Sequence, residues 1–302
     1  METHYDVLIA GGGPAGLSAA LALGRARKRV LLCDVSSTRR NLAAVHLHNF
    51  VTRDGTTPEE FRRVAREQLA AYPNVTVRDV RIESISGARG NFEVKLAEGS
   101  ATARRIILAT GMIDTKLPIP GFAELWGQSI FQCPYCHGWE VREERWAFIA
   151  PSVEHLPFAF QLRAWTRDVV VFIAELPAEQ RARLEAAGIT IETAPVTRLV
   201  SREGKLEAIE LANGKRIARD VLFAHPPQRQ FELVSNLGLA LDEEGFVKVD
   251  AMTRETSVPG IYAAGDLTTR LQAAIIASGQ GMQAAAVLNF ELTTELATNG
   301  VL

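Results

Sequence analysis

Two cysteines separated by two residues, Cys133 and Cys136, are the side chains of this chain with the most distinctive chemistry. His137 follows them directly, and a histidine, with an ordinary pKa of about 6.5, can take a thiol proton at neutral pH. The thiolate is the reactive form of cysteine, and a neighbouring imidazolium stabilises it. The pattern predicts a redox-active dithiol with His137 as its base. Two alternatives stay open: half of a metal site, and His137 as a polar residue without a proton role.

The third cysteine, Cys33, does not extend this group into a metal site. It lies in a predicted strand beside Asp34, where a small apolar side chain is expected in the core. A zinc site needs about four ligands, and the cysteine pair supplies two. We therefore expect no metal.

A second motif that could do chemistry is glycine-rich. Gly11, Gly13 and Gly16 stand between a predicted strand (residues 5–10) and a helix of small residues (15–27), and Asp34 closes the next strand (29–34). In this context Gly11 permits a tight turn, Gly13 lets a pyrophosphate approach the backbone, and Gly16 allows close packing of helix and strand. Asp34 can accept hydrogen bonds from a ribose. The motif predicts a dinucleotide site, against the alternative of a glycine-rich turn without a ligand.

Near the C-terminus, Gly265 and Asp266 follow a predicted strand and precede a final helix that ends at about Leu296. A carboxylate at the end of a strand lies where open α/β sheets bind their ligands. Asp266 could equally cap the following helix, and the two roles are compatible.

The composition indicates an ordinary globular protein of about two domains. The 302 residues are 47% hydrophobic and 23% charged, with a formal net charge of -2. No basic stripe is present, so we expect no nucleic-acid partner, and no apolar run is long enough for a membrane helix. The N-terminus carries no secretory pattern. We therefore expect a cytoplasmic, reducing location.

Two α/β halves must position these residues. The first has the strand, turn and helix described above, short strands in residues 75–96 that suggest an antiparallel hairpin insert, and a strand over 105–109. A boundary falls near Asp114. The middle segment then repeats the pattern, with strands at 145–150 and 169–174 and helices at 154–166 and 177–187. The fold class predicted is α/β, with two Rossmann-like three-layer domains.

Five motifs in this order resemble the low-molecular-weight thioredoxin reductase family. They are the glycine motif, Ala109-Thr110-Gly111, the turn from Pro118 to Gly121, the cysteine pair, and Ala264-Gly265-Asp266. The resemblance covers essentially the whole chain. It implies an FAD-binding domain formed by residues 1–114 and 244–302, an inserted domain of pyridine-nucleotide type (115–243) that carries the dithiol, and a homodimer.

The resemblance also assigns the cofactor residues. The ADP half of FAD would be held at the glycine turn and the strand after it, and the flavin half further along the chain. Asn49 would lie near the isoalloxazine, Asp266 would meet the ribityl and pyrophosphate groups, and Gln272 would lie under the ring. The full set is Gly11, Gly13, Pro14, Ala15, Gly16, Asp34, Asn49, Thr110, Gly111, Gly265, Asp266, Gln272 and Ala273.

One departure from the family lies in the inserted domain. Where thioredoxin reductases have a glycine-rich turn for NADPH, this chain has Pro151, Ser152, Glu154 and His155. Proline removes a backbone N–H, a side chain occupies the place where phosphate must approach, and a carboxylate adds repulsion. The next strand is followed by Glu175 rather than by a basic pair. We expect poor binding of nicotinamide nucleotides.

The second departure is His137, which stands where thioredoxin reductases have an aspartate. Together with the degraded nucleotide turn, it resembles the dithiol oxidase branch that includes gliotoxin- and holomycin-forming enzymes. That resemblance implies oxidation of a small-molecule or protein dithiol, with molecular oxygen as acceptor and hydrogen peroxide as product. Two alternatives remain: reduction of a protein disulfide with NADPH or ferredoxin, and a flavin-bearing sensor without turnover.

Overall fold

The computed structural model describes residues 3–35 and 40–301, which form two compact units. Unit 1 takes the described parts of Met1–Leu42, Asn49–Ile113 and Gln228–Leu302, and unit 2 takes Ala43–His48 and Asp114–Pro227. One break thus falls beside Asp114. The other falls between Pro227 and Gln228, earlier than the expected break at 244, because Val234 and Leu239 are buried in the core of unit 1.

Unit 1 is built on a seven-stranded sheet. The parallel part comprises β1 (Thr3–Ala10), β2 (Val30–Asp34), β3 (Val75–Asp79), β6 (Gly99–Leu108) and β17 (Ile261–Ala263). β5 (Asn91–Leu96) and β4 (Ile82–Ala88) continue it as an antiparallel meander from β6. The expected hairpin insert is therefore part of the main sheet. The prediction of an antiparallel strand is wrong for the first segment of this insert, which is β3, since β3 pairs in parallel with the fully buried β2.

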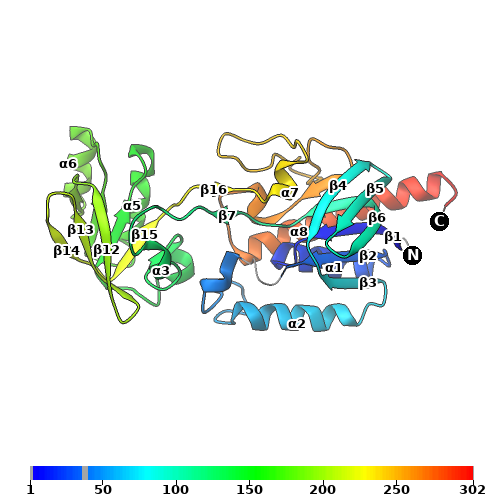
Figure 1. Ribbon diagram of the computed structural model, residues 1–302, viewed down its shortest axis with the longest axis horizontal. Helices are drawn as coiled ribbons and strands as arrows, with labels where there is room; N and C mark the ends of the chain where they lie inside the picture. The colour runs from blue at the N-terminus through cyan, green and yellow to red at the C-terminus, as the bar shows by residue number, and fades with distance from the viewer. Residues whose placement is uncertain (1–2, 36–39, 302) are drawn as a thin grey trace. The chain divides into compact units, whose positions relative to one another are not determined.

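Three helices of unit 1 pack against one another and against this sheet. α1 (Pro14–Arg25) and α8 (Ala274–Thr298) pack side by side (Figure 1), and α2 (Pro58–Ala70) packs against α1. The α1–α8 contact is close: a Cβ added at Gly281 would lie 2.0 Å from the Ala15 carbonyl oxygen. α2 begins at an N-cap, where Thr57 accepts a hydrogen bond from the Glu60 N–H at 3.1 Å and Pro58 occupies the first helical position. Within the described ranges, no helix combines the length and the apolar character needed to cross a membrane.

Unit 2 has its own parallel sheet, in the order β11-β10-β9-β15-β8. The strands are β8 (Ile130–Phe131), β9 (Trp146–Ile149), β10 (Val169–Phe172), β11 (Thr190–Glu192) and β15 (Val221–Ala224). The helices are α3 (Phe122–Leu125), α4 (Pro134–His137), α5 (Leu156–Leu162) and α6 (Ala178–Ala186). A three-stranded antiparallel sheet follows, with β12 (Val196–Arg202), β13 (Lys205–Leu211) and β14 (Arg216–Ala218).

Two short elements complete the connections. β7 (Ile113–Asp114) pairs with β16 (Gln228–Arg229) where the chain passes between the units, and α7 (Glu232–Ser235) follows β16. Both units are α/β and contain parallel sheets, so the predicted fold class is confirmed.

Candidate active site

The glycine turn after β1 has the geometry that its spacing predicts. Gly11 has φ +107°, and a Cβ there would lie 2.3 Å from the Ala109 carbonyl oxygen. A Cβ at Gly16 would lie 1.9 Å from the Gly11 carbonyl oxygen, which explains why the start of α1 can pack so closely. A Cβ at Gly13 would meet nothing within 4 Å. The backbone at Gly13, the N-cap of α1, is therefore open to a ligand at a helix N-terminus, where phosphate is favoured.

Asp34, at the end of β2, faces this turn. Its Oδ1 accepts a hydrogen bond from the Gly12 N–H at 3.0 Å, and its Oδ2 is ion-paired with the Arg62 guanidinium of α2. Arg62 also donates to the Gly12 carbonyl oxygen. Both charged side chains are buried. Burial and the neighbouring Arg66 lower the pKa of Arg62 to about 10, so the guanidinium stays charged at neutral pH.

The start of α1 and the two later cofactor segments approach one another. Ala15 lies against the turn that follows β17, since a Cβ added at Gly265 would lie 3.1 Å from the Ala15 Cβ. Pro14 occupies the first turn of α1, and its carbonyl oxygen is 3.4 Å from the Ser278 hydroxyl of α8. Gly265 has φ +80° and its N–H donates to Gln280. The glycine turn and the Gly265 turn thus lie close together in unit 1.

Asp266 lies in the short helix η4 (Gly265–Thr268), and Arg40 holds it. Arg40 Nη1 lies 2.8 Å from Asp266 Oδ2 and 2.5 Å from Gln272 Oε1. Gln272 also exchanges hydrogen bonds with Gln228 and donates to the Asp266 carbonyl oxygen. Ala273 is the N-cap of α8, next to Gln272. This network holds Asp266 and Gln272, which the resemblance assigned to the flavin. It does so through Arg40, which was not among the assigned residues.

The remaining assigned residues lie at turns of unit 1. Thr110 and Gly111 follow β6, with Gly111 at φ +68° and open space around its Cα. Asn49 lies in an exposed turn with φ +61°, where its backbone N–H donates to Asp54. The open backbone at Gly13 and Gly111 and the buried Asp34 carboxylate fit a bound dinucleotide.

The cysteine pair lies in unit 2, at the carboxyl end of β8. Cys133 is the N-cap of the one-turn helix α4, Pro134 occupies its first position, and Cys136 lies inside it. The Cys136 N–H donates to the Cys133 carbonyl oxygen at 3.2 Å, so the turn draws the two cysteines together. The turn also requires Gly138, because a Cβ there would lie 2.5 Å from the Pro134 carbonyl oxygen.

His137 is the last residue of α4 and stacks on Phe131, with ring centroids 4.4 Å apart and planes at 12°. Neither of its ring nitrogens, both shielded from solvent, makes a hydrogen bond to any residue that the structure describes. Burial lowers its pKa from the ordinary value of 6.5, the nearby Glu140 opposes this, and His48 adds to it. His137 is therefore neutral and able to accept a proton at neutral pH.

The turn after β9, where a nucleotide phosphate would be expected, is filled by side chains. The Ser152 hydroxyl donates to the Glu154 carboxylate and lies 3.0 Å from His155 Nδ1. Residues Val153–His155 form a 3-10 turn (η3), and α5 begins only at Leu156. The hydrogen bond from Ser152 lowers the pKa of the exposed Glu154. The side chains present an anion where a phosphate would have to bind.

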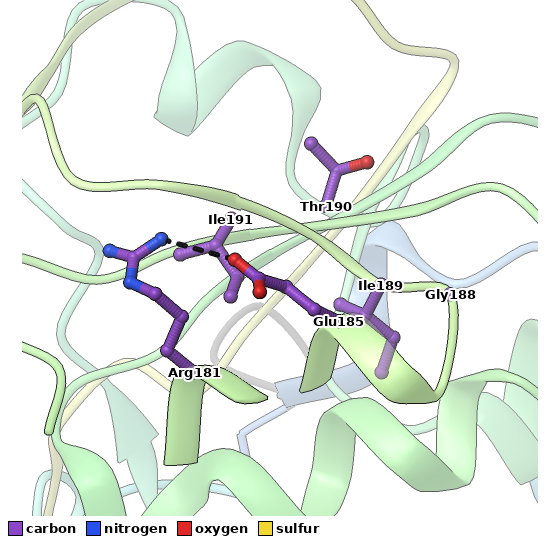
Figure 2. A pocket seen from close by; sticks show the side chains of 6 residues that line it. All are labelled: Arg181, Glu185, Gly188, Ile189, Thr190 and Ile191. Atoms are coloured by element: carbon purple, nitrogen blue, oxygen red, sulfur yellow. Dashed lines mark ion pairs between the residues drawn. The ribbon is translucent and has the colours of Figure 1, made fainter. Parts of the chain in front are cut away.

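Unit 2 also contains a pocket that is separate from the cysteines. Figure 2 shows an open pocket on α6 and β11, lined by Arg181, Glu185, Gly188, Ile189, Thr190 and Ile191. Arg181 and Glu185 are ion-paired across it at 3.6 Å, and it contains no cysteine or histidine. Among residues 3–35 and 40–301, no three His, Cys, Asp or Glu side chains are arranged to hold a metal.

Cys33, expected in the core, is buried in β2. Burial raises the pKa of its thiol to about 12, so it remains protonated and unreactive. Cys133 and Cys136, both partly exposed, are therefore the candidates for thiol chemistry.

Residues 5–281 match the pyridine nucleotide-disulphide oxidoreductase family, and the chain belongs to this family. Thioredoxin reductase aclD of Aspergillus oryzae is 33% identical over 93% of this chain and 94% of its own length. Thioredoxin reductase sirT of Leptosphaeria maculans is 30% identical over 95% of this chain and 94% of its own. The chain is thus a thioredoxin-reductase-like disulfide oxidoreductase.

Solved structures agree with this placement. An oxidoreductase from Agrobacterium tumefaciens superposes with a TM-score of 0.90 at 36% identity, covering 97% of this chain and 99% of its own. HlmI superposes with a TM-score of 0.90 at 32% identity, covering 98% and 95%. Thioredoxin-reductase-like members of the family are FAD-binding flavoproteins, so the predicted cofactor, FAD, is confirmed.

The sequence missed four titratable residues that the fold brings to these segments. They are Arg40 and Arg62 in unit 1, and His48 and Glu140 in unit 2. One signal was available: Arg62 lies on the same face of α2 as the buried Pro58 and Leu69, where a charged side chain needs a partner. The others make contacts between segments far apart in sequence or in irregular turns, which no local pattern reveals.

Proposed function

We propose that this oxidoreductase is an FAD-dependent dithiol oxidase. A substrate dithiol attacks the disulfide formed by Cys133 and Cys136, leaves as its own disulfide, and converts the enzyme pair to two thiols. When bound, FAD accepts the two electrons from this pair and passes them to molecular oxygen, which gives hydrogen peroxide. Following the family resemblance, Cys133 would exchange with the substrate and Cys136 would pass the electrons on to the flavin.

The observation that supports an oxidase is the filled turn after β9. For NADPH to reduce the flavin, it must first bind, and binding requires that a phosphate of NADPH come close to backbone N–H groups at this turn. Here Ser152, Glu154 and His155 occupy the turn with hydrogen-bonded side chains, and Glu154 is ionised. Electrons must then come from another reductant, and the dithiol substrate is the reductant that the cysteine pair can take.

His137 supplies the proton chemistry in this proposal. Its imidazole is neutral because burial lowers its pKa, and it lies one residue after Cys136. It accepts the proton of a thiol as the S–H bond breaks, which leaves a thiolate able to attack a disulfide.

In unit 1, we propose that the residues assigned from the sequence hold FAD. Gly13 and the start of α1 would take the pyrophosphate, and Asp34 would meet the adenosine ribose. Arg40 and Gln272 would hold the segment around Asp266 for the flavin half.

We propose that the substrate is a small, planar dithiol, because aromatic side chains near the cysteines in the sequence are exposed. Tyr135 lies between the two cysteines and is 61% exposed, and Trp139 is 66% exposed. The Arg142 guanidinium lies 4.1 Å from the centroid of the Trp139 ring and holds it. Two exposed aromatic side chains within six residues of Cys133 suit stacking on a planar dithiol.

We also propose the homodimer that the family resemblance implies. α8 exposes apolar side chains at Ile275, Met282 and Phe290, which recur every seven or eight residues and so share one face. A face of this kind can pair with its copy across a twofold axis.

A second candidate function is the reduction of a protein disulfide, because the curated relatives aclD and sirT are named thioredoxin reductases. The experiment that separates the two is anaerobic reduction of the flavin, followed by its absorbance. An oxidase is bleached by a small dithiol and scarcely by NADPH. Rapid stoichiometric bleaching by NADPH would favour the reductase.

A further inference from the structure

A histidine–glutamate pair that includes a residue of the turn after α4 lies outside the residues that the proposed function uses. His48 Nε2 lies 3.5 Å from Glu140 Oε1, although 92 positions separate them in the sequence. Residues Ala43–His48 belong to unit 2 by their contacts, and they are held there closely: a Cβ added at Gly127 would lie 2.6 Å from the Ala43 Cβ. Glu140 comes three residues after His137, in the turn that follows α4.

These two residues act on His137 in opposite directions. The Glu140 carboxylate favours the imidazolium form of His137, and His48 disfavours it. The Cys133 backbone also favours the imidazolium, without meeting hydrogen-bond geometry. His46 lies behind the pair, with its ring 6.0 Å from that of His48. Besides burial, the groups that set the charge of His137 are thus Glu140, His48 from a separate segment, and the Cys133 backbone of its own turn.

A histidine that is shielded from water needs a nearby negative charge to stabilise its protonated form. His137 stacks on Phe131 and makes no hydrogen bond to the described residues, so nothing in direct contact offsets the cost of its positive charge. The Glu140 side chain is 44% exposed and that of His48 is 18% exposed, so the pair reaches from the shielded imidazole toward water. A carboxylate held in this position can both stabilise the imidazolium and exchange protons with solvent.

We propose that Glu140, held by His48, is a positioning residue that lets His137 take the thiol proton. The S–H bond of a thiol breaks, its proton binds the His137 imidazole, and the sulfur keeps the electron pair as a thiolate. The imidazolium then loses this proton to water at the Glu140–His48 pair, and His137 is neutral again. No electron moves in these steps. This inference deepens the proposed function and rests on it for the identity of the reaction.

Two variants test it because they must shift His137 in opposite directions. Glu140→Gln removes the charge that raises the pKa of His137, so its protonation moves to lower pH. His48→Asn removes the group that lowers this pKa, so protonation moves to higher pH. Glu140→Asp keeps a carboxylate and should behave more like the wild type than Glu140→Gln does. Glu179→Gln, an exposed acid on α6, is the matched control and should change nothing.

The measurements use the full FAD-bound protein. The first is an NMR titration of ¹³C-labelled histidine, with the His137 signal assigned from His137→Asn. The second is the pH dependence of iodoacetamide alkylation of the reduced cysteine pair, which needs no substrate. The third is dithiol oxidation, where Glu140→Gln should lower the plateau rate about 2- to 10-fold as His137 becomes a weaker base.

The outcomes separate this inference from the proposed function. Shifts of opposite sign in the two variants, in both the His137 titration and the pH dependence of alkylation, support the positioning role. If these shifts are seen but no dithiol is oxidised, only the proposed function fails. Unshifted titrations in both variants, equal to those of Glu179→Gln, overturn it. If Glu140→Gln does not fold, Glu140→Ala decides: a His137 titration moved to lower pH supports the role of the carboxylate, and a wild-type titration overturns it.

Discussion

The Arg62 guanidinium of α2 is ion-paired with the Asp34 carboxylate at the end of β2, and both side chains are only 9% exposed. Asp34 in turn accepts the Gly12 N–H, and Arg62 donates to the Gly12 carbonyl oxygen. The two side chains therefore hold both polar groups of one residue in the glycine turn. In the proposed site this clamp fixes the turn that meets the pyrophosphate.

Arg62→Met should destabilise unit 1 and weaken FAD binding. Removing one partner of a buried ion pair leaves the other charge uncompensated, which typically costs about 3 to 5 kcal/mol. The free energy of unfolding, from denaturant titration, and the fraction of FAD retained after dialysis measure the two effects.

Arg63→Met is the matched control on the same helix. Arg63 pairs with Glu60 and Glu67 at the surface, where ion pairs contribute little. Equal stability and equal FAD retention in the two variants would show that the Arg62 clamp is not required.

The sequence could predict the glycine turn because its geometry is local. Gly11 and Gly16 stand at the spacing that permits a tight turn and a close helix, and the structure shows both close approaches. The parallel strand–helix pattern was predictable for the same reason, since strand burial and helix starts are set by neighbouring residues.

Other features depend on contacts between distant segments or on a single proline. The helix expected over residues 154–166 is only α5, because Pro157 fixes the start of the helix beside Leu156 and the preceding residues form η3. The Arg40–Asp266 contact joins residues 226 positions apart. No periodicity in either segment specifies such a pair, so the sequence identified Asp266 without its partner.

Trp139→Ala should weaken the binding of planar dithiols while leaving the dithiol chemistry intact. Loss of one aromatic contact typically costs about 0.5 to 1.5 kcal/mol, so we expect KM to rise about 2- to 10-fold with kcat nearly unchanged. Steady-state oxidation of an aromatic dithiol and of a flexible aliphatic one measures the difference.

The control for this prediction is Trp139→Phe, which keeps an aromatic face and should keep most of the affinity. A Trp139→Ala variant with unchanged KM for the aromatic dithiol would contradict a role for this ring in substrate binding.

Met282→Glu should dissociate the proposed dimer. A carboxylate in the centre of the apolar face of α8 would have to lose its water in the interface, which costs more than the contact returns. Light scattering coupled to size-exclusion chromatography gives the mass. Ala178→Glu, exposed on α6, is the control and should remain a dimer; a dimeric Met282→Glu variant would place the interface elsewhere.

His137→Asn should slow dithiol oxidation and remove one limb of its pH profile. Burial lowers the pKa of His137 from 6.5, so the neutral base persists at neutral pH and is lost only as pH falls through this lowered value. The wild-type rate should therefore rise with pH through a limb below 6.5 and then level off. Without the imidazole, we expect a rate about 100- to 10,000-fold lower with this limb absent.

His137→Asp, which restores the residue found in thioredoxin reductases, should move the limb to a different pH or lower the rate, because a carboxylate is a weaker base. Cys133→Ser and Cys136→Ser set the reference for complete loss, since each should abolish oxidation while the flavin stays bound in unit 1. Stopped-flow reduction of the flavin by dithiol, from acid to alkaline pH, measures all four variants. Wild-type rates and profiles in both His137 variants would assign the thiol proton to another acceptor.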